Sequence, residues 1–414
     1  AQPASVEVKV IQPENWTKLQ TMFLEKKSTL GELREGKADP KEKESAEAID
    51  IAAQYYSYRV TWPNLQNAAT HEMDKAFLEF ENEIKGAVRN LSYPYLKALA
   101  EKMAKYCKDV MDSNSKAIAR INSARLLARL AEAGLDETAD VLTEEANKND
   151  QYEAVKYYAL KGLKALVGAA NQPKSTVFTG PKGAERQAKA IQALVTIVDR
   201  KPPIPEALTP EEMNGFRKVR LEAIEGLANF RKPAVLDDKG NIKVPVARAL
   251  IEVIQKEGMV PQPRIEEQVA AAAGLGNMQV KGFPTYQPSY AALQVAPFFL
   301  EFATRYQDRA NGGRDAKEPW KIYAARLIES LDSFRRENAG NNDLTTVIDQ
   351  FLTILKAIED GAQVNPGELK QWLADHPPKA ETSLFKGIPD TKLKQATPDE
   401  KEKPAKPPET DKKK

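Results

Sequence analysis

A twelve-residue pattern that recurs along the chain constrains its fold more than any other feature. Val155–Leu166 (VKYYALKGLKAL) and Val219–Phe230 (VRLEAIEGLANF) share Val, a basic residue, Ala, an aliphatic residue, a charged residue and Gly-Leu at equal positions. Glu267–Met278 keeps part of this pattern, Ile322–Phe334 keeps less, and residues 116–133 have the right length without the pattern. A helix of this kind cannot bury its apolar face alone, so the recurrence predicts stacked helices. The alternative is that ordinary amphipathic helices coincide.

A glycine occupies the same place in both full copies. Gly in a helix interior costs about 1 kcal/mol relative to Ala, so Gly162 and Gly226 need a compensating reason. We expect that Ala and Gly on one face allow a neighbouring backbone to approach, while Val and Leu fill the core.

Here the chain resembles HEAT-type α-solenoid repeat proteins. In that family the second helix of each pair carries a Val-Arg start and an Ala…Leu core stripe, as Val219, Arg220, Ala223 and Leu227 do here. The resemblance covers roughly residues 115–360. It implies an all-α fold of stacked helix pairs, an irregular α-solenoid, whose long surface binds other proteins.

The repeat spacing departs from that family. The equivalent alanines Ala159, Ala223 and Ala271 are 64 and 48 residues apart, whereas family repeats are about 40–47 residues long. An aspartate common between paired helices is also not evident. Loop insertions, such as the Pro-rich residues 171–183 and 201–210, explain the long spacing.

The remaining sequence predicts the organisation around the array. We expect an N-terminal segment (1–40), a helical cap (41–115), a HEAT-like array (116–378) and a disordered tail (391–414). Within the first segment, the alternating valines of Ser5–Ile11 predict a short strand, and residues 14–35 predict one helix. The tail is rich in Lys, Pro and Glu and lacks aromatic residues from residue 397, so it cannot bury enough apolar surface to fold.

Composition excludes several classes of protein. The chain has 414 residues, one cysteine and two histidines, which excludes a disulfide framework and a multi-cysteine or histidine-rich metal site. Its net charge of +2 gives no reason to expect a specific nucleic acid partner. A mean hydropathy of −0.54, without a long apolar run, predicts no transmembrane segment.

The start Ala-Gln-Pro-Ala is typical of a cleaved export signal, and equally of a trimmed chain. Export to the periplasm or cell envelope is therefore one expectation.

Few features of the sequence indicate a catalytic function. Nucleophilic catalysis needs a histidine base, and His71 and His376 are interpreted as a solvated helix start and a loop residue. Cys107 lies among apolar helix positions and is expected to be buried and inert. The turn 237–241 has too few ligand positions for a calcium loop. We expect no cofactor and no metal, although an all-α carbohydrate-active enzyme with paired carboxylates stays an alternative.

The function that we expect is non-catalytic protein binding or scaffolding along the array. The candidate contact residues are Tyr157, Lys161 and Arg220 on the repeated helices, together with Phe283 and Tyr286 in a loop. For the two loop aromatics, plain packing is the alternative to a contact site. A second possible function is a structural one, in which copies of the chain assemble with each other in an envelope layer or filament. The identity of a protein partner is not encoded in these patterns.

Overall fold

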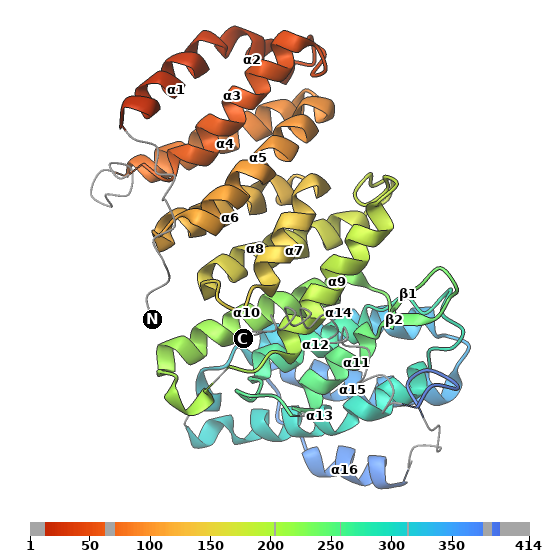
Figure 1. The fold of residues 1–414 in the computed structure, drawn as a ribbon. Helices are drawn as coiled ribbons and strands as arrows, with labels where there is room; N and C mark the ends of the chain where they lie inside the picture. Colours follow the sequence, from red (N-terminus) through yellow and green to blue (C-terminus); the bar gives the residue numbers. More distant parts are fainter. Residues whose placement is uncertain are drawn as a thin grey trace, which may run out of the picture.

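The computed structural model describes residues 13–62, 71–202, 204–256, 258–312, 314–375 and 383–389. Within these residues the protein is all-α, with sixteen α-helices that pack mostly against their neighbours in sequence (Figure 1). The predicted all-α class is therefore confirmed. The strand predicted at residues 5–11 and the tail at 391–414 lie outside the described residues.

Five helices form the N-terminal end of the stack, at the top of Figure 1. They are α1 (Pro13–Glu25), α2 (Lys27–Arg34), α3 (Lys43–Arg59), α4 (Glu72–Arg89) and α5 (Tyr93–Ser113). The single helix predicted over residues 14–35 is wrong, because the chain leaves the helical conformation at Lys26 (φ −86°, ψ 4°). This break directs α2 onto α3 and α4, where Leu30 and Leu33 become buried.

From α5 onward the helices alternate between two layers. Layer A contains α5, α7 (Ala139–Asn147), α9 (Gly183–Asp199), α11 (Val246–Gln255) and α13 (Pro288–Asp308). Layer B contains α6 (Ala117–Glu132), α8 (Glu153–Ala170), α10 (Pro210–Phe230), α12 (Ile265–Gly276) and α14 (Trp320–Glu337). Each layer B helix packs against the next one in its layer, and α6, α8, α10 and α12 also pack against the layer A helix before them. The chain therefore advances through the stack one helix pair at a time.

The last helices close the stack at its lower end (Figure 1). These are α15 (Asn342–Asp360), which packs on α13 and α14, and α16 (Pro366–Asp375), which packs on α13. In the part of the chain that the structure describes, four short 3₁₀ helices lie in the connections, at Asp136–Thr138, Pro205–Ala207, Arg309–Asn311 and Arg314–Lys317. Among the described residues, no helix combines the length and the apolarity that crossing a bilayer requires.

The recurring sequence pattern falls on consecutive helices of layer B. Its two full copies lie in α8 and α10, its partial copies extend over α12 and α14, and residues 116–133 form α6. Sequence-equivalent segments are therefore also neighbours in space, because each of these helices packs against the next.

The glycines of the pattern lie at close helix contacts. A methyl group on Gly162 would lie 3.2 Å from Cα of Ala128 in α6, and one on Gly274 would lie 3.0 Å from Cα of Ala228 in α10. The approach of a neighbouring backbone expected at Gly162 is therefore confirmed, although the side chain of Leu142 lies closer still, at 2.7 Å, and Gly274 of the partial copy shows the same kind of backbone contact. At Gly226 the expectation is wrong, because the three nearest atoms all belong to the side chain of Leu194 in α9, the nearest at 2.9 Å from the added methyl.

The one β-sheet among the described residues is a small hairpin between α10 and α11. Strands β1 (Val235–Leu236) and β2 (Ile242–Val244) pair antiparallel, with Val235 opposite Val244. The carboxylate of Asp237 accepts hydrogen bonds from the backbone N–H groups of Lys239 and Asn241, at 2.9 and 2.8 Å. The predicted turn between two short extended pieces is confirmed, and this carboxylate stabilises it.

Candidate functional site

A row of ion pairs links the helices of layer B. We call it the charged face and define it by seven charged residues and two tyrosines: Arg129, Glu132, Tyr157, Tyr158, Lys161, Lys164, Glu222, Glu225 and Arg326. The seven charged side chains are between 13% and 41% exposed. Each therefore packs its aliphatic stem on the helices while its charged end stays within reach of solvent.

The first part of the charged face joins α6 to α8. Arg129 in α6 pairs with Glu132 one turn later, and its Nε lies 3.2 Å from Oε1 of Glu81 in α4. Glu132 in turn lies 3.4 Å, through Oε1, from Nζ of Lys161 in α8. The charges alternate in sign along this path, so each one neutralises its neighbours.

The second part joins α8 to α10 and α14. Nζ of Lys164 lies 2.5 Å from Oε2 of Glu222 and 2.9 Å from Oε2 of Glu225. Although burial lowers the pKa of Lys164, these two hydrogen bonds raise it overall. Glu225 also lies 3.5 Å from Nη1 of Arg326. That contact connects α10 and α14, the two helices that flank α12.

Two tyrosines lie beside these charges. The rings of Tyr157 and Tyr158 meet edge to face, with centroids 5.3 Å apart, and both side chains are half-buried. Burial, and then the adjacent carboxylate of Glu222, raise the pKa of Tyr157. The charged face thus offers aromatic area, which is enriched in protein interfaces, beside charges of both signs, which suit the polar rim of an interface.

Two of the predicted contact residues, Tyr157 and Lys161, lie together on the charged face. The predicted exposure of Arg220 is wrong, because its side chain is 1% exposed between α10 and α12. Its Nε donates to Oε1 of Glu267 at 2.7 Å, and its Nη1 donates to the carbonyl oxygen of Pro261 at 2.7 Å. The carboxylate of Glu267 balances the charge of the guanidinium and allows its burial, while Nη2 is buried without a hydrogen-bond partner.

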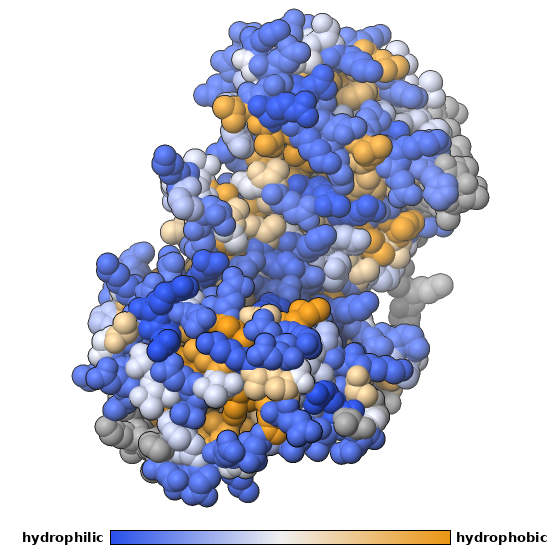
Figure 2. Space-filling model, turned by 180° about the vertical axis from the view of Figure 1, so that it is seen from behind, coloured by the Kyte–Doolittle hydropathy of each residue, from blue (hydrophilic) through white to orange (hydrophobic). Residues whose placement is uncertain are grey.

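The two predicted loop residues lie elsewhere, just before α13. Tyr286 is buried, with 5% of its surface exposed, so it is not an exposed contact residue in this conformation. Phe283 is half-buried against the hydrophobic core. For these residues the structure favours packing over an exposed contact site. Figure 2 shows apolar side chains grouped in the middle of the lower half of the rear face, and further apolar patches among the hydrophilic side chains of the upper half.

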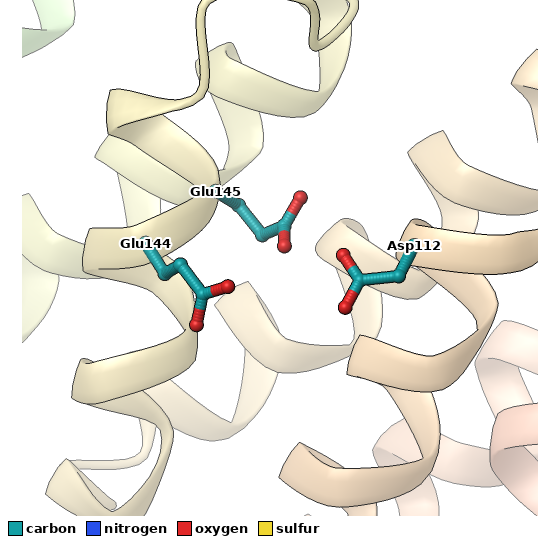
Figure 3. Close-up of side chains that lie close together, drawn as sticks. All are labelled: Asp112, Glu144 and Glu145. Atoms are coloured by element: carbon teal, nitrogen blue, oxygen red, sulfur yellow. The ribbon is translucent and has the colours of Figure 1, made fainter. Parts of the chain in front are cut away.

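Three carboxylates converge between α5 and α7, at a place where no sequence pattern predicted a site. Asp112, Glu144 and Glu145 point toward one another (Figure 3), with one oxygen of each within 4.8 Å of the others. Lys148 pairs with all three, and Lys108 pairs with Asp112 and Glu144. The ammonium groups of Lys108 and Lys148 occupy the position that a metal cation would take, so the cluster is a salt-bridge network.

The histidine and the cysteine that the structure describes have ordinary environments. His71 is exposed at the start of α4, with Nδ1 3.5 Å from Oδ2 of Asp74. Cys107 is fully buried with its Sγ 3.4 Å from Oγ of Ser57, and burial raises the pKa of its thiol to about 12. These observations agree with the solvated histidine and the buried thiol that the sequence predicts. His376 lies outside the described residues.

Comparisons of the chain with protein families, with curated proteins and with solved structures gave no match.

Proposed function

We propose that the chain is a non-catalytic protein-interaction or scaffold protein that binds its partners along the charged face of an irregular, HEAT-like α-solenoid. The observation that carries this proposal is the continuity of the charged face, which runs from α6 through α8 and α10 to α14. The solenoid interpretation is supported by the recurring pattern, whose copies occupy consecutive layer B helices.

The chemistry of the charged face favours a folded protein as the partner. Charges of both signs recognise a surface with the complementary arrangement, and a wrong register brings like charges together. The tyrosines beside them supply rigid apolar area with a polar end. The carboxylates among the cations also interrupt any continuous positive surface, which a phosphate backbone would require.

The proposal is tested by crosslinking and affinity capture of the intact chain from its native cells. The test variant is Tyr157→Ala/Lys161→Ala, which removes an aromatic and a cationic contact from α8. The control is Lys189→Ala, because Lys189 pairs with Glu185 on α9 and both side chains are 59% exposed. We expect the test variant to lose its crosslinked partners while the control retains them. Capture of the same partners by all three proteins, with unchanged circular dichroism spectra, would contradict the proposal.

Self-assembly is the second candidate function, and exposed apolar side chains favour it. Leu91 is 72% exposed, Ile322 is 68% exposed and Ile204 is 63% exposed. Light scattering of the purified chain, separated by size, distinguishes the two functions. A mass far above 46.0 kDa with crosslinks only between copies would favour self-assembly.

A further inference from the structure

A short segment, residues 383–389, is seated against the helical stack, and we call it the strap. One antiparallel bridge places Phe385 opposite Tyr286. The backbone N–H of Lys386 donates to the carbonyl of Thr285 at 2.7 Å, and the N–H of Gln287 donates to the carbonyl of Leu384 at 3.0 Å. The N–H of Ile388 donates to the carbonyl of Phe385 at 2.9 Å, so the strap turns back on itself directly after this bridge. The strap is therefore held by one antiparallel bridge just before α13.

Side chains of the strap and of residues 286 and 287 add to this contact. Leu384 and Phe385 are fully buried, and the ring of Phe385 lies 5.7 Å from that of Tyr286. The side-chain amide of Gln287 donates to the carbonyl of Ser383 at 3.0 Å. The recognition elements are thus the main-chain hydrogen bonds of one bridge and two adjacent apolar side chains.

One buried polar group beside the strap, the hydroxyl of Tyr286, is in an unfavourable environment. Tyr286 lines a cavity of about 30 Å³ between α12, α13, α14 and α15. Its hydroxyl is buried, and no protein atom pairs with it. Burying a hydroxyl without a partner costs free energy. If the strap left, Tyr286 would lose its contact with Phe385 and could turn its hydroxyl toward solvent, which would offset part of the lost packing.

We propose that residues 285–287 and the start of α13 form a docking site for a peptide segment with adjacent leucine and phenylalanine, and that the strap occupies this site in cis. A partner segment of the same chemistry displaces the strap. In this mode of binding, main-chain hydrogen bonds supply affinity and side-chain pockets supply selectivity. The proposal concerns a surface separate from the charged face and does not depend on the function proposed for it.

The direct test uses the full chain with the strap released. The variant Leu384→Ala/Phe385→Ala removes both buried side chains, and the probe is a fluorescent peptide with the sequence of residues 381–390, ETSLFKGIPD. We expect fluorescence anisotropy to show at least tenfold tighter binding to this variant than to the unmodified chain, because the cis strap competes in the latter. A peptide with alanine at both apolar positions should not bind. The variant Ile322→Ala, changed at an exposed position of α14, is the matched control and should bind like the unmodified chain.

Hydrogen exchange provides a second test that does not depend on how the double variant folds. In the unmodified chain, we expect the amides of Lys386 and Gln287 to exchange together and at least tenfold faster than those of α12. The variant Tyr286→Phe removes the unpaired hydroxyl and should slow both amides. Two results would overturn the proposal: no peptide binding by a double variant with a native circular dichroism spectrum, or equal protection of these amides and α12.

Discussion

Arg220 is the largest of the fully buried side chains among the described residues, and it depends on one acidic partner. Its Nε lies 2.7 Å from Oε1 of Glu267, and the two side chains are 1% and 2% exposed. Removing one member of a buried pair leaves the other charge without compensation, which typically costs 3–5 kcal/mol. We therefore expect Arg220→Met to lower the free energy of unfolding by about 3–5 kcal/mol in urea titrations followed by circular dichroism.

A double variant and an exposed pair serve as controls for this prediction. Arg220→Met/Glu267→Gln removes both charges and should regain part of the loss. Arg335 and Asp349 form an exposed pair, with side chains 49% and 45% exposed, so Arg335→Met should cost less than about 1 kcal/mol. A similar small cost for Arg220→Met would show that the buried pair contributes no more than the exposed one.

Glu137 makes the free energy of unfolding depend on pH. One of its oxygens is buried without a hydrogen-bond partner, the other lies 4.0 Å from Nζ of Lys97, and burial raises the pKa of the carboxyl. Because the folded state holds this proton more tightly than the unfolded state, ionisation costs stability as the pH rises through the folded pKa. Below the unfolded pKa the cost is absent. We expect Glu137→Gln to raise the free energy of unfolding at pH 7 and to leave it unchanged near pH 3.

Glu185 is the matched control for Glu137, because its pKa is shifted in the opposite direction. A hydrogen bond from Lys189 lowers the pKa of Glu185, an exposed residue in α9. Its ionised form therefore favours the folded state, and Glu185→Gln should slightly lower the free energy of unfolding at pH 7. Urea titrations of both variants at the two pH values measure these differences. An equal response of both variants would show that burial is not the cause.

At the scale of the helices, α12 shows why small residues recur in layer B. Its residues are buried except for Glu266, because α10, α11 and α14 surround it. A methyl group on Gly274 would meet Cα of Ala228 at 3.0 Å, a backbone atom that cannot rotate away. We expect Gly274→Ala to lower the free energy of unfolding by about 1–3 kcal/mol, the usual cost of overpacking.

A second helical glycine provides the control for Gly274. A methyl group on Gly215 in α10 would have no atom within 4 Å. Gly215→Ala should therefore raise stability by up to about 1 kcal/mol, since alanine favours the helix. Thermal melts of both variants measure the difference. If both variants gained stability, the close contact between α10 and α12 would not limit residue size.

The elements were easier to predict than their contacts. Helices such as α14 and α15, and the hairpin turn at Asp237, follow from local periodicity and turn residues, which a single sequence contains. The exposure of Arg220 was predicted wrongly because its partner Glu267 is 47 residues away. The ion pairs of the charged face likewise join distant helices, so only Tyr157 and Lys161 were found from the sequence. The strap escaped prediction because its two buried residues, Leu384 and Phe385, follow the last helix and have no periodicity.

At the scale of the whole molecule, helix pairs that contact mainly their neighbours predict a gradient of local stability. Among the described residues, helix α8 packs against α6, α7 and α10, whereas α16 makes its principal contact with α13 and α1 packs mainly on α2 and α3. Opening a helix at either end therefore breaks fewer contacts than opening one in the middle. We expect hydrogen exchange measured by mass spectrometry to show the slowest exchange in α8, α10 and α12, and the fastest helical exchange in α1 and α16. Uniform protection from α1 to α16 would contradict this prediction, because the stack would then open only as one cooperative unit.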